Sequence, residues 1–274
     1  MTFLSVNPEK CNKCKTCVSI CPMFVLELKE GESVPTPVDY LKDQCLDCGQ
    51  CAAVCPTAAL AHRSLSPDNS IPLKSDLNVS PEQVEQLLRS RRSIRTYKKA
   101  PVEKDKIQKL LELSSCAPTS HNDRAVHWTV LYEAEEMKKI TGIVFDWFKH
   151  MINEYPEMAD SLLPINEMYK SGKDMIFRNA PHIVVASGPA PTTYTAPEID
   201  CVTAIAYLEI VALGIGIGTC WSGAFNNAAK AWPPLQEALN LPEGHQVFGA
   251  VLLGHPKFKY SRIPLRDDTS ISWK

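Results

Sequence analysis

Apolar and polar positions change their spacing at about residue 80. Residues 63–80 are rich in serine, proline, aspartate and asparagine and show no apolar periodicity, which is typical of a linker. Beyond this stretch, segments of helical spacing alternate with short apolar runs. We therefore expect two domains, residues 1–63 and 81–274, joined by a linker at 64–80.

The pattern after the linker predicts a mixed domain of helices around one sheet. Ser80 and Gln83 form a capping box at the start of the first helix, with Pro81 at its first position. Helical spacing predicts helices at 81–90, 103–115, 135–154, 197–213 and 228–239. Short apolar runs predict strands at 127–133, 182–187, 217–222 and 246–253.

The run from Ile199 to Trp221 is apolar enough to suggest a membrane span. Asp200 and Glu209 interrupt it, and the glycines at 214, 216 and 218 break it. A buried or interface helix is the better interpretation, so we expect no membrane association.

Composition narrows the possible partners and the compartment. The 274 residues carry a formal net charge of −2 from nearly balanced acidic and basic residues, which argues against nucleic acid as a partner, because that would need a concentrated basic surface. The N-terminal residues lack the apolar run of a signal peptide, so a cytoplasmic location is expected. Because disulfides are rare in that reducing compartment, the eleven cysteines indicate metal or redox chemistry.

Eight of the eleven cysteines form two quartets before residue 56. Each quartet has the spacing C-x2-C-x2-C-x3-C-P, and the two are offset by 34 residues, which indicates an internal duplication. The quartets are Cys11, Cys14, Cys17 and Cys21, then Cys45, Cys48, Cys51 and Cys55.

This spacing is typical of proteins that hold two [4Fe-4S] clusters. Three thiolates of each loop bind one cluster, and the fourth binds the cluster of the other loop. The expected ligand sets are Cys11, Cys14, Cys17 and Cys55 for the first cluster, and Cys21, Cys45, Cys48 and Cys51 for the second. Residues 1 to about 63 thus resemble bacterial two-cluster ferredoxins.

Two other interpretations of the quartets stay open. Structural zinc could use the Cys-x2-Cys pairs, but a four-thiolate site would leave half of the ligands unused. The third cysteine of each loop and the repeated Cys-Pro ending do not follow from zinc-ribbon geometry either. Clusters with a purely structural role are the second alternative.

The three remaining cysteines are Cys116, Cys201 and Cys220. Small buried apolar positions are the simplest expectation for all three. Cys220 also lies in one of the motifs described next, so its redox activity is left open.

Four short motifs are spread over the larger domain. They are Arg91-Arg92-Ser93-Ile94-Arg95, Ala117-Pro118-Thr119-Ser120-His121-Asn122, Cys220-Trp221-Ser222-Gly223 and Tyr260-Ser261-Arg262-Ile263-Pro264. Guanidinium and hydroxyl donors in the first suit a phosphate and an electron-rich heterocycle. In order and spacing, residues 80 to about 270 resemble the nitroreductase family of FMN enzymes.

The resemblance implies that eight residues bind the FMN. Arg91 and Ser93 would bind its phosphate with Arg262, and Arg92 would lie along the ribityl chain. Arg95 would reach N1 and O2 of the ring, and Asn122 the opposite edge. The backbone N–H of Gly223, beside Ser222, would donate to N5.

The two resemblances together imply an α+β protein: a small two-cluster ferredoxin-like domain followed by a nitroreductase-like α/β/α domain. The family also implies a homodimer. The expected activity is electron transfer from the clusters to FMN and on to a nitroaromatic, quinone or enone acceptor, with external ferredoxin or NAD(P)H as donor. No proton donor or other catalytic residue is assigned.

Two alternatives stay open for the function. One is a redox-sensing or electron-carrier module without a dedicated substrate. The other is an NAD(P)H-driven flavin reductase that feeds the clusters.

Overall fold

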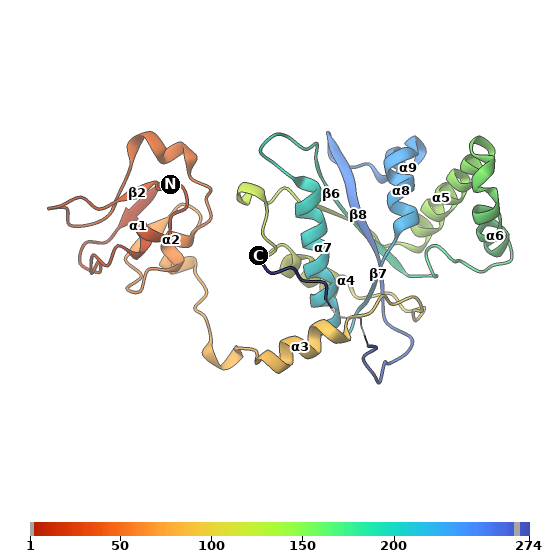
Figure 1. Ribbon diagram of the computed structural model, residues 1–274, viewed down its shortest axis with the longest axis horizontal. Coiled ribbons are helices and arrows are strands. Elements are labelled where there is room, and N and C mark those ends of the chain that lie inside the picture. Colours follow the sequence, from red (N-terminus) through yellow and green to blue (C-terminus); the bar gives the residue numbers. More distant parts are fainter. Residues whose placement is uncertain (1–2, 266–268) are drawn as a thin grey trace. The chain divides into compact units, whose positions relative to one another are not determined.

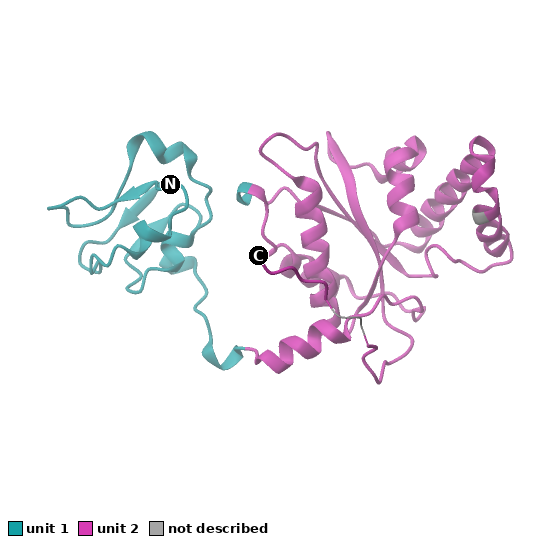
Figure 2. Ribbon diagram, in the orientation of Figure 1, with its two compact units in different colours: residues 1–78, 121–123 teal, residues 79–120, 124–274 magenta. Residues whose placement is uncertain are grey.

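The computed structural model describes residues 3–265 and 269–274. The chain forms two compact units, coloured separately in Figure 2: Met1–Asn78 with His121–Asp123, and Val79–Ser120 with Arg124–Lys274. Within the predicted linker the only helical structure is a pair of short 3-10 turns, Pro67–Asn69 and Ser75–Leu77. The domain bounds at residues 63 and 81 stay predictions.

The first unit contains two short helices and two antiparallel strand pairs (Figure 1). Strand β1 (Leu4–Val6) pairs with β4 (Leu60–His62), and β2 (Leu26–Glu27) pairs with β3 (Thr36–Pro37). The helices are α1 (Thr16–Ile20) and α2 (Gln50–Ala53). A small core of apolar residues joins these elements: Leu4, Cys17, Val25, Leu26 and Leu60.

The backbone of this unit carries the duplication seen in the sequence. Residues with positive φ recur in pairs 34 positions apart: Lys13 and Asp47 (56° and 50°), Lys15 and Gly49 (59° and 68°), Phe24 and Ala58 (54° and 51°). A left-handed backbone is costly for residues other than glycine, so both loops adopt the same unfavourable turns. Local side-chain preference does not explain this match, since the paired residues differ in type.

The second unit is built around a four-stranded antiparallel sheet in the order β5-β6-β8-β7 (Figure 1). Its strands are β5 (His127–Leu131), β6 (His182–Pro189), β7 (Gly218–Trp221) and β8 (His245–Gly254). Its helices are α3 (Pro81–Ser90), α4 (Lys104–Ser114), α5 (Ala134–Glu154), α6 (Ala159–Lys170), α7 (Pro197–Gly214), α8 (Gly223–Ala231) and α9 (Pro233–Leu239).

Helices cover both faces of this sheet. Alternate residues of β6 divide between two cores: Ile183 and Val185 face α5, α8 and α9, whereas Val184 and Ala186 face α4 and α7. A strand that is buried on both faces has no polar side, because successive side chains point in opposite directions. This explains why β6 appears in the sequence as an unbroken apolar run.

Most predicted elements of this unit are confirmed to within two residues, including the Ser80–Gln83 capping box. Two differences have physical reasons. The helix expected at 228–239 is two helices, which Trp232 separates. Pro233 begins the second one, because proline starts a helix readily but interrupts one. Helix α6 was missed because Pro164 lies in its interior, which disfavours a helix prediction.

The apolar run from Ile199 to Trp221 is divided between α7 and β7. Glu209 and Asp200 are both buried in α7, whereas Ile199, Val202 and Tyr207 on the same helix are 65%, 41% and 42% exposed. Among residues 3–265 and 269–274, no helix is both long and apolar enough to span a membrane.

A glycine-to-alanine exchange at β7 is expected to destabilise the second unit. A Cβ at Gly218 would lie 2.8 to 2.9 Å from three side-chain atoms of Ile94, so Gly218→Ala should cost about 1–3 kcal/mol through overpacking. Gly142→Ala in α5 is the matched control, since a Cβ there meets nothing within 4 Å and alanine favours a helix by up to about 1 kcal/mol. Urea denaturation followed by circular dichroism measures both. Equal stabilities of the two variants would contradict this packing.

Candidate functional site

The eight cysteines of the quartets surround two cavities in the first unit. Cys11, Cys14, Cys17 and Cys55 line one cavity. Cys21, Cys45, Cys48 and Cys51 line the other. In each group three residues come from one loop and the fourth from its duplicate, which is the grouping expected from the sequence.

The electrostatics of these groups suit a bound cation. Burial, together with the neighbouring thiols of Cys48 and Cys21, raises the pKa of Cys51 to about 11. Burial also raises the pKa of Cys17, and Cys55 and Cys14 act in the same direction. Four thiols packed together lose their protons readily only when a metal compensates the negative charge. The donor set therefore fits iron–sulfur clusters.

Several hydrogen-bond donors approach the sulfur atoms. In the first group, Thr16 Oγ1 donates to Cys14 Sγ (3.2 Å) and the Ala59 N–H donates to Cys55 Sγ (3.3 Å). In the second group, Nε2 of the buried His62 lies 3.5 Å from Cys45 Sγ. His62 could not be predicted from the sequence, because nothing in the cysteine spacing indicates which strand residue faces a sulfur atom.

The cysteines outside the quartets divide into two kinds. Cys201 and Cys220 are buried, as expected, and burial raises the pKa of Cys201 to about 12. The expectation for Cys116 was wrong, because this residue is exposed. Cys116 lies in the turn that follows α4 and the C-cap residue Ser115, and its side chain is outside the core.

In the second unit, backbone hydrogen bonds hold the segment of the arginine motif beside the segments that precede two other predicted flavin motifs. Ser93 forms a parallel bridge with Thr219 of β7, and the Ile94 N–H donates to the Thr219 carbonyl (2.8 Å). The Lys98 N–H donates to the His255 carbonyl (2.8 Å), directly after β8. The arginine motif thus lies beside both the segment that leads to Ser222 and the segment that leads to Arg262.

A buried carboxylate holds the first arginine of the motif. Glu209 of α7 accepts from Arg91 Nη1 (3.3 Å), Thr219 Oγ1 (3.3 Å) and Trp221 Nε1 (3.2 Å). Glu209 is only 8% exposed, so these donors offset the cost of burying its charge. In the sequence, Glu209 is recognisable only as a charge that interrupts an apolar run. Its role depends on contacts with residues that are distant in the sequence: Arg91 is 118 positions away, and Thr219 is 10 positions away.

The predicted residues Arg92 and Arg262 share one cavity. It has a volume of about 900 Å³ and is also lined by Lys98, Lys259 and Tyr260, among others. Its guanidinium and ammonium groups suit an anion such as a phosphate. Among the described residues, Arg92 Nη2 is buried without a hydrogen-bond partner, which leaves a charged donor for a ligand.

The other predicted flavin residues lie as follows. Ser222 Oγ is also buried without a partner among the described residues, and a Cβ at Gly223 would meet nothing within 4 Å. Arg95 is exposed. Asn122 belongs to the first unit, where its side chain donates to the Leu46 carbonyl (3.0 Å). The orphaned donors and the open space at Gly223 fit a bound flavin, while the role of Asn122 stays a prediction.

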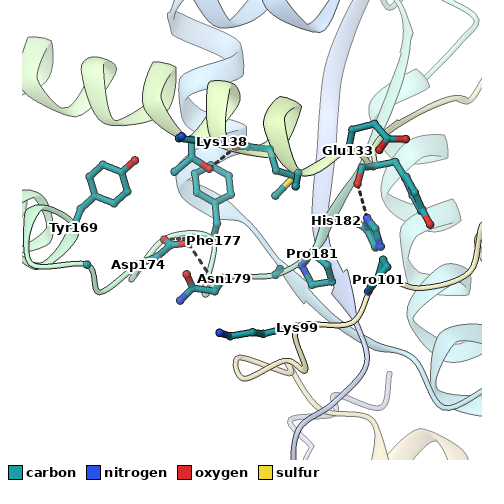
Figure 3. A pocket seen from close by; sticks show the side chains of 16 residues that line it. Lys99, Pro101, Glu133, Lys138, Tyr169, Asp174, Phe177, Asn179, Pro181 and His182 are labelled. Atoms are coloured by element: carbon teal, nitrogen blue, oxygen red, sulfur yellow. Dashed lines mark hydrogen bonds between the residues drawn. The ribbon is translucent and has the colours of Figure 1, made fainter.

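Figure 3 shows a second large cavity, of about 520 Å³, lined by residues that include Lys99, Lys138 and Tyr169. None of the predicted flavin residues lines it. Two of its polar groups are used by the fold: the buried His182 accepts from the Val102 N–H (2.9 Å), and the half-buried Asp174 accepts from the Phe177 N–H (2.7 Å). Groups that are already satisfied give no indication of redox chemistry there.

Comparison with known protein families gives two matches. Residues 88–255 match the nitroreductase family, and residues 10–59 match the 4Fe-4S dicluster domain. A relative from Archaeoglobus fulgidus, named "Putative NADH dehydrogenase/NAD(P)H nitroreductase", is 26% identical over 178 residues, 64% of this chain and 87% of the relative. A relative of the same name from Methanothermobacter thermautotrophicus is 24% identical over 181 residues, 66% of this chain and 81% of the relative.

Solved structures show the same fold. A Bacteroides fragilis nitroreductase with bound FMN aligns with a TM-score of 0.53 at 21% identity, over 69% of this chain and 99% of that one. A Desulfitobacterium hafniense nitroreductase with bound FMN aligns with a TM-score of 0.55 at 21% identity, over 71% and 100%. These matches confirm the predicted α+β fold class. The chain therefore belongs to the nitroreductase family of oxidoreductases and carries a 4Fe-4S ferredoxin domain before its nitroreductase domain.

Proposed function

We propose that this protein is an iron–sulfur flavoprotein that passes electrons from two [4Fe-4S] clusters to FMN and on to an organic acceptor. The observation that carries the proposal is the pair of four-cysteine cavities in a chain that belongs to the nitroreductase family. The acceptor class is nitroaromatic, quinone or enone. A cytoplasmic location is part of the proposal.

The two cysteine groups are the proposed cluster ligands. Cys11, Cys14, Cys17 and Cys55 would hold one cluster, and Cys21, Cys45, Cys48 and Cys51 the other. Each cluster, when bound, supplies a one-electron couple. The protein holds the sulfur atoms in place, shields them partly from water and donates hydrogen bonds to them, all of which affect the reduction potential.

The FMN residues are proposed from the family motifs. FMN, when bound, supplies both single-electron and hydride chemistry. Arg91, Ser93 and Arg262 would bind the phosphate, and Arg92 would donate to the ribityl chain. Arg95 would stabilise negative charge at N1 and O2 of the ring, and Asn122 would donate at the opposite edge.

The last two residues of the proposed FMN site lie where β7 ends and α8 begins. The Gly223 N–H is one of the first N–H groups of α8, which have no acceptor within the helix, so it can donate to N5 beside Ser222. No side chain crowds that N–H, because Gly223 has none. The Arg91–Glu209 pair would fix the direction of the first arginine before the cofactor binds.

A homodimer is proposed as the working assembly. The face of α7 that carries Ile199, Val202 and Tyr207 is exposed in the single chain, although these side chains are large and apolar. Burying such a face against a second copy removes apolar surface from water. Sedimentation velocity of the holoprotein tests the assembly.

Anaerobic stopped-flow spectroscopy tests the proposed function. The holoprotein is mixed with reduced ferredoxin or with NAD(P)H, and the cluster and flavin absorbances are followed separately. We expect reduced ferredoxin to bleach the clusters before the flavin, and a nitroaromatic or quinone to restore both. Bleaching of the flavin by NAD(P)H while the clusters stay oxidised would contradict the proposed path. The names of the two relatives favour NAD(P)H as the second candidate donor.

A further inference from the structure

A buried histidine faces the second cysteine group. His62 ends β4 and is 5% exposed, and it lines the cavity together with Cys21, Cys45, Cys48 and Cys51. The ring of Phe3 packs edge-on against it, with 5.3 Å between the ring centroids. A buried imidazole needs a hydrogen-bond partner for each ring nitrogen, so the contacts of the two nitrogens indicate which of them carries the proton.

Two groups of Ser64 contact Nδ1. The Ser64 hydroxyl lies 2.7 Å from it and can donate or accept, so the backbone N–H of the same residue determines the tautomer. The backbone N–H of Ser64 donates to His62 Nδ1 (3.1 Å), and a backbone amide can only donate. Nδ1 is therefore an acceptor and carries no proton, which places the ring proton on Nε2. Nε2 lies 3.5 Å from Cys45 Sγ, within the range of a hydrogen bond to sulfur.

Among the described residues, Asp47 also offers an acceptor close to this proton. Asp47 Oδ1 is 3.6 Å from His62 Nε2, but the same carboxylate accepts from Arg63 Nε (2.5 Å) and Arg63 Nη2 (2.7 Å). A two-point pair with a guanidinium satisfies most of what a carboxylate can accept. The sulfur of Cys45 is therefore the better partner for the Nε2–H of His62.

We propose that His62 is a positioning residue for the second cluster: its Nε2–H donates to Cys45 Sγ and raises the reduction potential of the cluster held by Cys21, Cys45, Cys48 and Cys51. Reduction adds negative charge, which spreads onto the thiolate sulfur atoms, and a donor stabilises that charge. The proposal rests on the proposed cluster ligation but not on the identity of the acceptor. The first cysteine group has its own donors, Thr16 and the Ala59 N–H.

The test compares two substitutions in the full-length holoprotein. His62→Leu keeps the bulk and removes the donor, whereas His62→Gln keeps an amide N–H near the position of Nε2. Anaerobic redox titrations followed by electron paramagnetic resonance measure both cluster potentials. We expect His62→Leu to shift one potential to a more negative value and leave the other unchanged, and His62→Gln to stay close to the unaltered protein. The same shift should persist when Cys14→Ala removes the first cluster.

Iron and acid-labile sulfide analyses give a readout that is independent of activity. Cys45, Asp47 and His62 offer ligand atoms within 4.8 Å of one another, so loss of iron from both His62 variants would make His62 a ligand and overturn the proposal. Equal shifts in both variants would indicate packing alone and also overturn it. Intact clusters with unchanged potentials would overturn this inference only, whereas an unaltered protein without clusters would overturn the proposed function as well.

Discussion

Replacing Cys14 by alanine is expected to remove about half of the bound iron and leave FMN bound. Cys14 lines the first cysteine cavity, so its loss deprives one cluster of a ligand while the four cysteines of the second cavity stay in place. Seven of the eight proposed FMN residues lie in the second unit, which has its own two cores. Iron analysis and the flavin absorbance of the purified protein measure both quantities.

Cys116→Ala is the matched control for this experiment. Cys116 is an exposed cysteine of the second unit and lines neither cysteine cavity, so its replacement should leave the iron content unchanged. Loss of flavin together with iron in Cys14→Ala would contradict the independence of the two units. Full iron content in that variant would contradict the proposed ligand set.

The cysteine groups could be predicted from the sequence because their geometry is local. Three thiolates within seven residues must share one tight loop, and the duplicated loop then supplies the fourth. The donors to the sulfur atoms depend on tertiary structure instead. His62 contacts Cys45, which is 17 positions away in the sequence. The pairing of β4 with β1 determines which face of β4 turns inward.

For the flavin motifs, too, the contacts that depend on tertiary structure could not be predicted from the sequence. Their order along the chain identified the family, but the sequence could not show that Arg91 pairs with Glu209 or that Arg92 and Arg262 share a cavity. These contacts form because the arginine motif lies beside β7 and the segment after β8. Apolar spacing predicts where helices and strands occur, whereas such neighbours follow from how the sheet is assembled.

Arg262→Ala is expected to weaken FMN binding roughly tenfold to hundredfold without unfolding the protein. A charge-assisted hydrogen bond to a phosphate contributes about 1.5–3 kcal/mol, which corresponds to that change in the dissociation constant. Arg262 is exposed, so its removal leaves no buried group without a partner. Quenching of flavin fluorescence on addition of the apoprotein measures the affinity.

Riboflavin, which lacks the phosphate, separates the phosphate contact from general effects on the pocket. Arg262→Ala should bind riboflavin as well as the unaltered protein does, because the lost contact is to the phosphate alone. Arg89→Ala is the matched control: Arg89 is an exposed arginine of α3 that pairs with Glu85 and does not line the cavity. A similar loss of FMN affinity in both variants would point to the overall charge of the protein, and an unchanged affinity in Arg262→Ala would remove this residue from the phosphate site.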